Sequence, residues 1–253
     1  MTPAERKNYY SKEASRPAPL SYLYTKKFVE TVNRAAKNSS RAKIFDDFLK
    51  CSAAALNRDE KTFAEVADKN LHCELFATLA NALEWSITFK VLFAHSLGND
   101  ALPMYRDILG EIFCELELFD QGGGQVLTPQ QTADIMGATT LTAELVKREI
   151  AQCGYVTIKE NCCGSGALIL GACNALLDLG VNPCRQARVQ ASDLDERCVL
   201  MTFIQLSLYG IPAVVLRQNA VTDEVVGSPL VTPILKKTNF TLKPNTSFFN
   251  YVL

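Results

Sequence analysis

The stretch YVTIKENCCGSGALIL, residues 155–170, decides the fold because its pattern changes twice within a short span. Residues 155–160 are rich in β-branched side chains, which predicts a short strand. A turn with two glycines follows, and an apolar run from Ala167 to Leu179 then predicts a helix that Gly180 ends. A strand, a tight turn and a helix in this order begin a βαβ unit.

Two further strands continue this order downstream. ARVQASD, residues 187–193, predicts the second strand, and the segment from Glu196 to Tyr209 predicts a helix closed by Gly210. AVVLRQN, residues 213–219, predicts the third strand. Strands that alternate with helices at this spacing predict an α/β fold, a doubly wound parallel sheet with right-handed crossovers.

The chain before this unit has a helical pattern. Residues 1–25 are interpreted as an irregular arm, because SRPAPLSY contains two prolines and no sustained period. Between residues 26 and 120, apolar residues recur at steps of three and four, which predicts an all-helical domain. Within this domain, Ser39 or Ser40 is expected to cap a helix that begins near Ala42.

A glycine-rich break separates the helical domain from the α/β domain, which is expected to cover residues 121–253. The helix predicted from Met104 to Phe119 ends at DQGGGQ, residues 120–125, because three consecutive glycines do not continue a helix. Thr128 and Pro129 then open the next helix, with Thr128 expected at the N-cap and Pro129 at the first helical position.

The net charge of −1 hides an uneven distribution along the chain. Residues 1–50 carry eleven Lys and Arg against five acidic residues, so this part has a charge of +6 and the remainder about −7. The basic residues are interleaved with Tyr9, Tyr10, Tyr22 and Tyr24. Such an arm could follow the phosphate backbone of DNA and stack on bases, or it could be an ordinary solvated tail.

The nine cysteines show no regular spacing, which predicts reduced, buried thiols in a cytoplasmic protein. A zinc site is not expected, because the chain has only His72 and His95 and no CxxC pair, and both histidines are interpreted as polar residues on helices. The charged amino-terminal residues predict no secretory signal. No apolar run is long enough for a membrane span, so no membrane association is expected.

Polar residues and glycines follow the end of each predicted strand, where ligands bind in sheets of this kind. Gly164 and Gly166 allow a tight turn and a close approach of the backbone to a ligand, and the helix start behind them offers free N–H groups to an anion. The candidate residues are Glu160, Asn161, Cys162, Cys163, Gly164, Ser165 and Gly166 after the first strand, Asp193 after the second and Asn219 after the third.

Three of these features in this order indicate an adenosine cofactor. Asp193 ends the second strand, where a carboxylate can accept hydrogen bonds from both hydroxyls of a ribose. Asn219 ends the third strand, where an amide can pair with an adenine edge. Ile169 stands where a dinucleotide loop has its third glycine, and no GK[ST] sequence exists for a nucleoside triphosphate. S-Adenosyl-L-methionine is therefore favoured over a dinucleotide.

Four motifs resemble those of N-6 adenine DNA methyltransferases, including the modification subunits of type I restriction systems. ENCCGSGALIL is similar to the family's D-P-x-C-G-S-G-x-h-h motif, and GQVLTPQQTADIM resembles its upstream G-Q-[FY]-[FY]-T-P-x-x-[VI]-A-x-x-[ML] motif. DILGEIFCELEL resembles the D-x-L-G-x-x-[YF]-E segment, and ASDLDERCVLMTFIQLSLYGI resembles the second motif with its following helix. The resemblance covers roughly Phe45 to Asn219, and it implies a Rossmann-like methyltransferase sheet and S-adenosyl-L-methionine as cofactor.

The resemblance also implies a role for each matching residue. Thr128 and Pro129 would contact the cofactor, while Glu160 and Gly164, together with Cys163, Ser165 and Gly166 of the same loop, would bind its amino and carboxylate ends. Asp193 would bind the ribose and Asn219 the adenine. The family has Asp where Glu160 stands and Pro where Asn161 stands, but Glu160 keeps the negative charge that holds an ammonium group.

The family's catalytic motif, [DNS]-P-P-[YFW], has no full match after the third strand. In the family, this motif orients the amino group of the adenine and stacks on the flipped base. Ser228 and Pro229 are the nearest candidates, and Thr232-Pro233 resembles a Thr-Pro found in short phage- and plasmid-borne relatives. The sheet could be incomplete, because only 34 residues follow Asn219. Either the chain is a short family member or its carboxyl end is not native.

Three functional interpretations remain at this stage. The chain could be an enzyme that transfers a methyl group to adenine in DNA, as part of a restriction–modification system. It could instead bind the cofactor or DNA without turnover, alone, as a homo-oligomer or with a partner subunit. In the third interpretation, the glycine loop is a structural turn in an α/β domain without a ligand.

Overall fold

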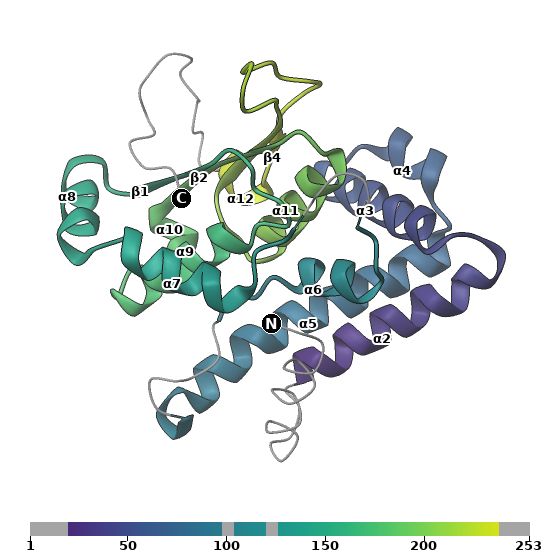
Figure 1. Cartoon of the computed structure of the whole chain (residues 1–253), viewed down its shortest axis with the longest axis horizontal. Coiled ribbons are helices and arrows are strands. Elements are labelled where there is room, and N and C mark those ends of the chain that lie inside the picture. Colours follow the sequence, from purple (N-terminus) through teal and green to yellow (C-terminus); the bar gives the residue numbers. More distant parts are fainter. Residues whose placement is uncertain (1–19, 98–103, 120–125, 238–253) are drawn as a thin grey trace.

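The computed structural model describes residues 20–97, 104–119 and 126–237 of the chain (Figure 1). The helices that precede the sheet are α2 (Leu20–Ala35), the 3₁₀ turn η1 (Ala36–Asn38), α3 (Arg41–Asn57), α4 (Glu60–Val66), α5 (Lys69–Leu97) and α6 (Ile108–Glu115). The following elements are α7 (Gln130–Thr140), α8 (Ala143–Cys153), β1 (Val156–Glu160), α9 (Ala167–Asp178), α10 (Pro183–Gln186), β2 (Ala187–Asp193), α11 (Glu196–Leu208), β3 (Ala213–Arg217), β4 (Leu230–Val231) and α12 (Pro233–Lys237).

The sheet has the strand order β1-β2-β3-β4. The first three strands are parallel, with Glu160 beside Ala191 and Asp193 beside Arg217, so their carboxyl ends lie at one edge. This confirms the predicted α/β fold with its three strands. The sequence did not predict β4, a two-residue strand that pairs antiparallel with β3.

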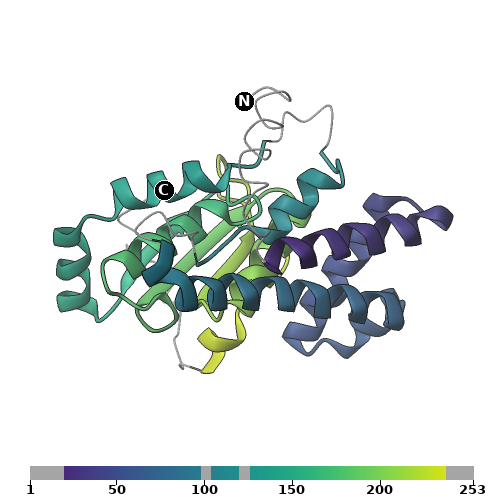
Figure 2. The same cartoon turned by 90° about the horizontal axis from the view of Figure 1, so that it is seen from below.

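The helices before the sheet and the α/β unit share one continuous apolar core. Phe28 of α2 and Phe45 of α3 belong to the same buried cluster as Ile158 of β1 and Phe203 of α11. In Figure 1, α4 and α8 lie at opposite ends of the molecule, with the sheet between them. Figure 2, turned by 90°, shows the long helix α5 running beneath the sheet, from the helices that precede the sheet to the α/β unit.

Arg197 of α11 adds a polar connection between the two parts. Its Nε and Nη2 atoms donate to the two carboxylate oxygens of Asp46 on α3, at 2.6 and 2.9 Å. Its guanidinium also lies 5.7 Å from the ring centroid of Phe113 on α6. A bidentate, partly buried ion pair of this geometry holds α3 and α11 in one orientation.

Helices α7 and α9 cross in unusually close contact. An added Cβ at Gly171 of α9 would lie 2.3 Å from the carbonyl oxygen of Ala133 on α7. At Gly137 of α7, it would lie 2.6 Å from the backbone of Gly171. Only glycine permits this approach of two backbones, and it fixes the start of α7, and with it Thr128, beside the loop that follows β1.

Several predicted helix boundaries need correction. Helix α2 begins at Leu20, inside the arm predicted as irregular. The reason is that Ser21, Thr25 and Phe28, which follow the prolines in sequence, form one buried face of a helix. Helix α6 is shorter than predicted, since Asp107 caps its first turn and the chain leaves the helix before Glu117, whose φ is +57°. The rest of the arm, residues 1–19 with Tyr9 and Tyr10, lies outside the described residues.

The structure also bears on the predicted helix cap at Ser40, the two histidines, the helix lengths and the cysteines. Ser40 caps α3, as predicted, by accepting a hydrogen bond from the Lys43 N–H at 3.1 Å. Both histidines are on α5, and His72 is buried. None of the helices in the described part of the chain combines the length and apolar composition that crossing a bilayer requires. Cys51, Cys163, Cys173 and Cys198 are buried, as predicted, but the expectation of burial is wrong for Cys73, Cys114, Cys153 and Cys162, which are exposed.

Candidate functional site

The carboxyl ends of β1 and β2 meet through a direct hydrogen bond. The Gly164 N–H, in the loop after β1, donates to Asp193 Oδ2 at the end of β2, at 2.9 Å. The Cys163 N–H donates to the Ser192 carbonyl at the same distance. Two of the features that the sequence analysis combined, the glycine loop and the acidic strand end, are therefore adjacent in space.

The loop itself requires its glycines. Gly164 and Gly166 have φ values of +53° and +100°, in the left-handed region that favours glycine. A Cβ at Gly166 would also lie 3.2 Å from Thr202 Oγ1 of α11. Gly166 is the N-cap of α9 and offers no side-chain cap, so the first N–H groups of this helix remain available to an anion.

Three buried side chains from outside the loop form hydrogen bonds to it. Thr202 Oγ1 donates to the Gly164 carbonyl at 2.9 Å, and Gln205 Nε2 donates to the Ser165 carbonyl at 2.7 Å. The Ser165 hydroxyl bonds to the Asp107 carboxyl. Sequence reasoning missed these supports, and the signal that could have found them was a polar pair, three residues apart, within the apolar face of α11.

Glu160 ends β1 with one carboxylate oxygen unpaired. Its Oε1 atom accepts a hydrogen bond from the Cys162 N–H at 2.8 Å, while Oε2 is buried and has no partner among the described residues. Burial is the main cause that raises the pKa of Glu160, and the charge of Asp193 raises it further. A buried carboxyl with a free acceptor is suited to a cationic donor.

The side chains of Asp193 and Asn219 each accept hydrogen bonds from backbone N–H groups of the turn that follows them. Asp193 Oδ1 accepts from the Asp195 N–H at 3.0 Å, and each of its oxygens keeps capacity for a second donor. Asn219 lies two residues beyond the end of β3, and its amide oxygen accepts from the Val221 and Thr222 N–H groups at 2.9 and 3.3 Å. This Asx turn is the reason that the third strand ends earlier than predicted.

A small pocket of about 40 Å³ lies beside the glycine loop, between residues 126–128 and residues 162–168. Leu127 is one of the lining residues, and it lies close to the glycine loop, since a Cβ at Gly164 would be 3.1 Å from Leu127 Cδ2. This volume exceeds the roughly 10–15 Å³ that one water molecule needs, so the pocket can hold water. S-Adenosylmethionine is much larger than this pocket and would extend beyond its lining residues.

Thr128 and Pro129 occupy different positions from those predicted. Helix α7 begins at Gln130, and Pro129, with an extended ψ of 144°, takes the N-cap position without a side-chain cap. Thr128 lines the pocket, whereas Pro129 is exposed. The prediction of a Thr128 cap was one residue out of register, because proline tolerates the N-cap backbone geometry as well as the first helical position.

Ser228 and Pro229, the weak catalytic candidates, are exposed on the connection between β3 and β4. The strand order puts β4 three strand spacings from β1, which corresponds to roughly 14 Å. Thr232 is fully buried and has a structural role: its hydroxyl donates to the Ile211 carbonyl and accepts from the Ala213 N–H. Thr232-Pro233 therefore anchors β4 against the start of β3.

No protein-family model matches the chain, and no curated protein matches its sequence. The chain is similar, at low sequence identity, to solved structures that include the following two. A Listeria monocytogenes protein described as a class I S-adenosylmethionine-dependent methyltransferase is 14% identical, with a TM-score of 0.43, and covers 76% of this chain and 52% of its own length. A type I restriction-modification system methyltransferase subunit from Streptococcus thermophilus is 13% identical, with a TM-score of 0.34, and covers 77% and 57%. The chain thus spans little more than half the length of either structure.

Proposed function

We propose that the residues at the carboxyl ends of β1, β2 and β3 bind S-adenosyl-L-methionine, and that the chain serves methyl transfer to the N6 atom of adenine in DNA. One observation carries the cofactor proposal. The Gly164 N–H bonds to Asp193, and next to this contact lies a buried Glu160 oxygen without a partner among the described residues. Together they offer a cation acceptor, a close backbone approach and a ribose acceptor at the carboxyl ends of β1 and β2.

Each residue would bind a different part of the cofactor. Glu160 Oε2 would accept from the ammonium group, and the free N–H groups at the start of α9 would bind the carboxylate. Asp193 would accept from the ribose hydroxyls, and Asn219 would contact the adenine. When bound, S-adenosylmethionine supplies an electrophilic methyl group. The protein's own contribution would be orientation of that group and exclusion of water, with Leu127 and Thr128 closing the outer side.

DNA adenine as the methyl acceptor is supported by the four family-like motifs and by the basic amino-terminal part of the chain. Replacing Arg6, Lys7, Lys12 and Arg16 by alanine should weaken DNA binding and reduce the slope of its salt dependence by about 0.9 for each phosphate that these side chains neutralise. Filter binding or fluorescence anisotropy over a salt series measures this slope. An unchanged slope would show that the arm binds no phosphates.

Titration calorimetry tests cofactor binding directly. S-Adenosylmethionine and S-adenosylhomocysteine should release heat, whereas NAD and ATP should not. Glu160→Gln and Asp193→Asn should each weaken binding by about tenfold or more, the effect of losing one charge-assisted hydrogen bond. Lys159→Gln, a change on the neighbouring residue, serves as the control. Absence of heat with about 1 mM S-adenosylmethionine would overturn the cofactor proposal.

A second candidate function, cofactor binding without methyl transfer, is favoured by one specific observation. The sequence lacks the [DNS]-P-P-[YFW] motif, and its nearest substitutes, Ser228 and Pro229, are on the connection that leads to β4. Incubation of the protein with radiolabelled S-adenosylmethionine and duplex DNA of mixed sequence separates the two functions. Label on the DNA supports the enzyme, while cofactor binding without label supports the binding protein.

A further inference from the structure

One buried carboxyl outside the glycine loop connects three segments of the chain. Asp107 is the N-cap of α6, where its Oδ1 atom accepts from the Gly110 N–H at 2.9 Å. The same oxygen accepts from Gln205 Nε2 of α11 at 2.8 Å, and Oδ2 bonds to the Ser165 hydroxyl in the loop after β1. Asp107 and Ser165 are 58 residues apart in sequence, and both are buried.

The hydrogen-bond directions within this cluster are determined by its chemistry. The Gln205 amide oxygen accepts from the Leu109 N–H, so its Nε2 atom faces Asp107 as a donor. An ionised carboxyl only accepts, which means that the Ser165 hydroxyl donates to it. Burial raises the pKa of Asp107, and the three donors oppose this rise.

Gly110 makes this approach sterically feasible. A Cβ at position 110 would lie 2.0 Å from Asp107 Oδ2 and 2.6 Å from Ser165 Oγ. The Asp-x-x-Gly spacing in DILG is thus explained by two needs: a carboxyl that caps the helix, and an empty Cβ position through which the same carboxyl reaches Ser165.

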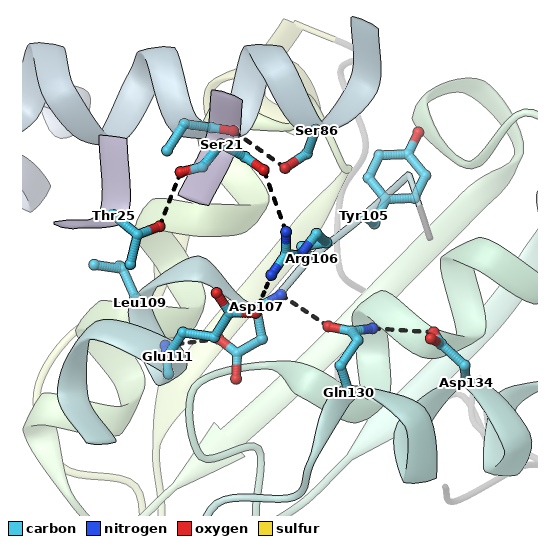
Figure 3. Close-up of polar contacts among 12 residues, drawn as sticks. Ser21, Thr25, Ser86, Tyr105, Arg106, Asp107, Leu109, Glu111, Gln130 and Asp134 are labelled. Carbon is cyan, nitrogen blue, oxygen red and sulfur yellow. Dashed lines mark hydrogen bonds and ion pairs between the residues drawn. The ribbon is translucent and has the colours of Figure 1, made fainter. Parts of the chain in front are cut away.

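A second connection runs from Asp107 to α7. The Asp107 N–H donates to Gln130 Oε1 at 2.9 Å, and Gln130 Nε2 donates to Asp134 Oδ1 at 3.0 Å. Figure 3 shows Gln130 between these two aspartates. Gln130 is the first residue of α7 and directly follows the segment that contains Leu127 and Thr128. Asp107 is therefore bonded to Ser165, which lines the pocket, and to Gln130, which lies two residues after the pocket residue Thr128.

We propose that Asp107 is a positioning residue for the cofactor: through Ser165 it holds the glycine loop in its binding shape, and through Gln130 it holds the start of α7 beside it. This inference rests on the proposed function for its ligand, but the loop order that it describes is a property of the free protein. Neither Asp107 nor Gln205 lines the pocket, so both act through the loop.

A double-mutant cycle tests whether Asp107 acts through Ser165. Asp107→Asn and Ser165→Ala should each weaken S-adenosylmethionine binding by about tenfold in titration calorimetry. The double variant should bind about as well as Ser165→Ala alone, because the shared path is already broken. A Kd for Asp107→Asn equal to that of the wild type would overturn the proposal. So would a loss of binding free energy in the double variant equal to the sum of the losses in the two single variants. Ser165→Ala keeps the α6 cap, so it remains informative if Asp107→Asn does not fold.

Asp59→Asn provides a matched control. Asp59 caps α4 as Asp107 caps α6, with its Oδ1 atom accepting from the Thr62 N–H at 3.1 Å, but it is exposed. Its replacement should leave the Kd unchanged. An equal loss of affinity in Asp59→Asn would mean that Asp107 acts only through general stability, and the positioning role would be wrong.

Hydrogen exchange of the free protein keeps this inference separate from the proposed function. The N–H groups of Cys163, Gly164 and Gly166 are hydrogen-bonded in the loop. In Asp107→Asn they should exchange about tenfold faster, while amides of α3 keep their rates. Unchanged loop exchange overturns the positioning role. If the wild type binds no cofactor while the loop exchange responds as expected, the proposed function fails and the positioning of the loop stands.

Discussion

The two ends of the sheet edge that we propose as the cofactor site differ in how many hydrogen bonds and buried residues hold them. At β1 and β2, the loop of residues 161–166 is bonded to Asp193, Thr202 and Gln205, and its residues Cys163, Ser165 and Gly166 are buried. At β3, residues 218–229 form an exposed connection held mainly by local turns, with Val221 92% exposed. The difference indicates that the glycine loop and Asp193 are held in place by buried hydrogen bonds, whereas the connection that contains Asn219 is held mainly by its own turns.

The crossing of α7 and α9 supports the end at β1 and β2, and breaking it should have the largest effect. Gly171→Ala puts a methyl group against the Ala133 carbonyl, a clash with backbone that cannot relax by side-chain rotation. We expect a loss of about 3 kcal/mol in the free energy of unfolding, measured by chemical denaturation. Ala138→Leu, at an exposed position of α7, should change it by less than about 0.5 kcal/mol. Equal stability of Gly171→Ala and wild type would contradict the close crossing.

Removing one support of the glycine loop should have the next largest effect. Thr202→Val keeps the shape of the side chain but leaves the Gly164 carbonyl without its buried donor. The expected loss is about 2 kcal/mol in unfolding free energy, together with weaker S-adenosylmethionine binding in calorimetry. Thr139→Val is the control, since the Thr139 hydroxyl is exposed and bonds only to carbonyls of its own helix. If both variants lose the same amount, Thr202 has no special role in the loop.

Glu160→Gln should separate binding from stability. The buried, unpaired Glu160 oxygen costs the free protein stability at neutral pH, so the neutral glutamine should stabilise it by about 1 kcal/mol, as measured by thermal or chemical unfolding. Cofactor affinity should fall in the same variant. A variant that loses stability would indicate that Glu160 is fully satisfied in the free protein.

The pH dependence of this effect follows from the raised pKa of Glu160. A carboxyl with a raised pKa contributes stability at low pH that is lost as the pH rises above the ordinary value of 4.5 and through the folded-state value. The stability of wild type relative to Glu160→Gln should therefore decrease over this range. Affinity for the cofactor ammonium should change in the opposite direction and increase as Glu160 ionises.

The smallest effect is expected at the exposed end of the edge. Val221→Ser should change the unfolding free energy by less than about 0.5 kcal/mol, because the side chain is almost fully solvated. It should also leave the Kd for S-adenosylmethionine unchanged in calorimetry. A clear loss of either quantity would show that this connection packs against the site, and the contrast between the two ends would disappear.

The elements that could be predicted from the sequence are those whose signals are local. The strand at residues 187–193 has its predicted bounds, and α9 and α11 each end one residue before the predicted position. β-Branched runs, apolar periodicity and terminal glycines act within a few residues, so a linear pattern captures them. β4 was not predicted because two residues are too few to show an alternating pattern of apolar and polar side chains, and because their pairing depends on β3.

By itself, the sequence determined the order of the elements, the glycines at residues 164 and 166, and the acid at the end of the second strand. Only the tertiary structure decided how these parts are supported: Asp107 meets Ser165 across 58 residues, and Gln205 meets Asp107 across 98. The physical reason is one of range. Backbone conformation is biased by neighbouring residues, whereas the partner of a buried polar group depends on how the whole apolar core brings distant segments together.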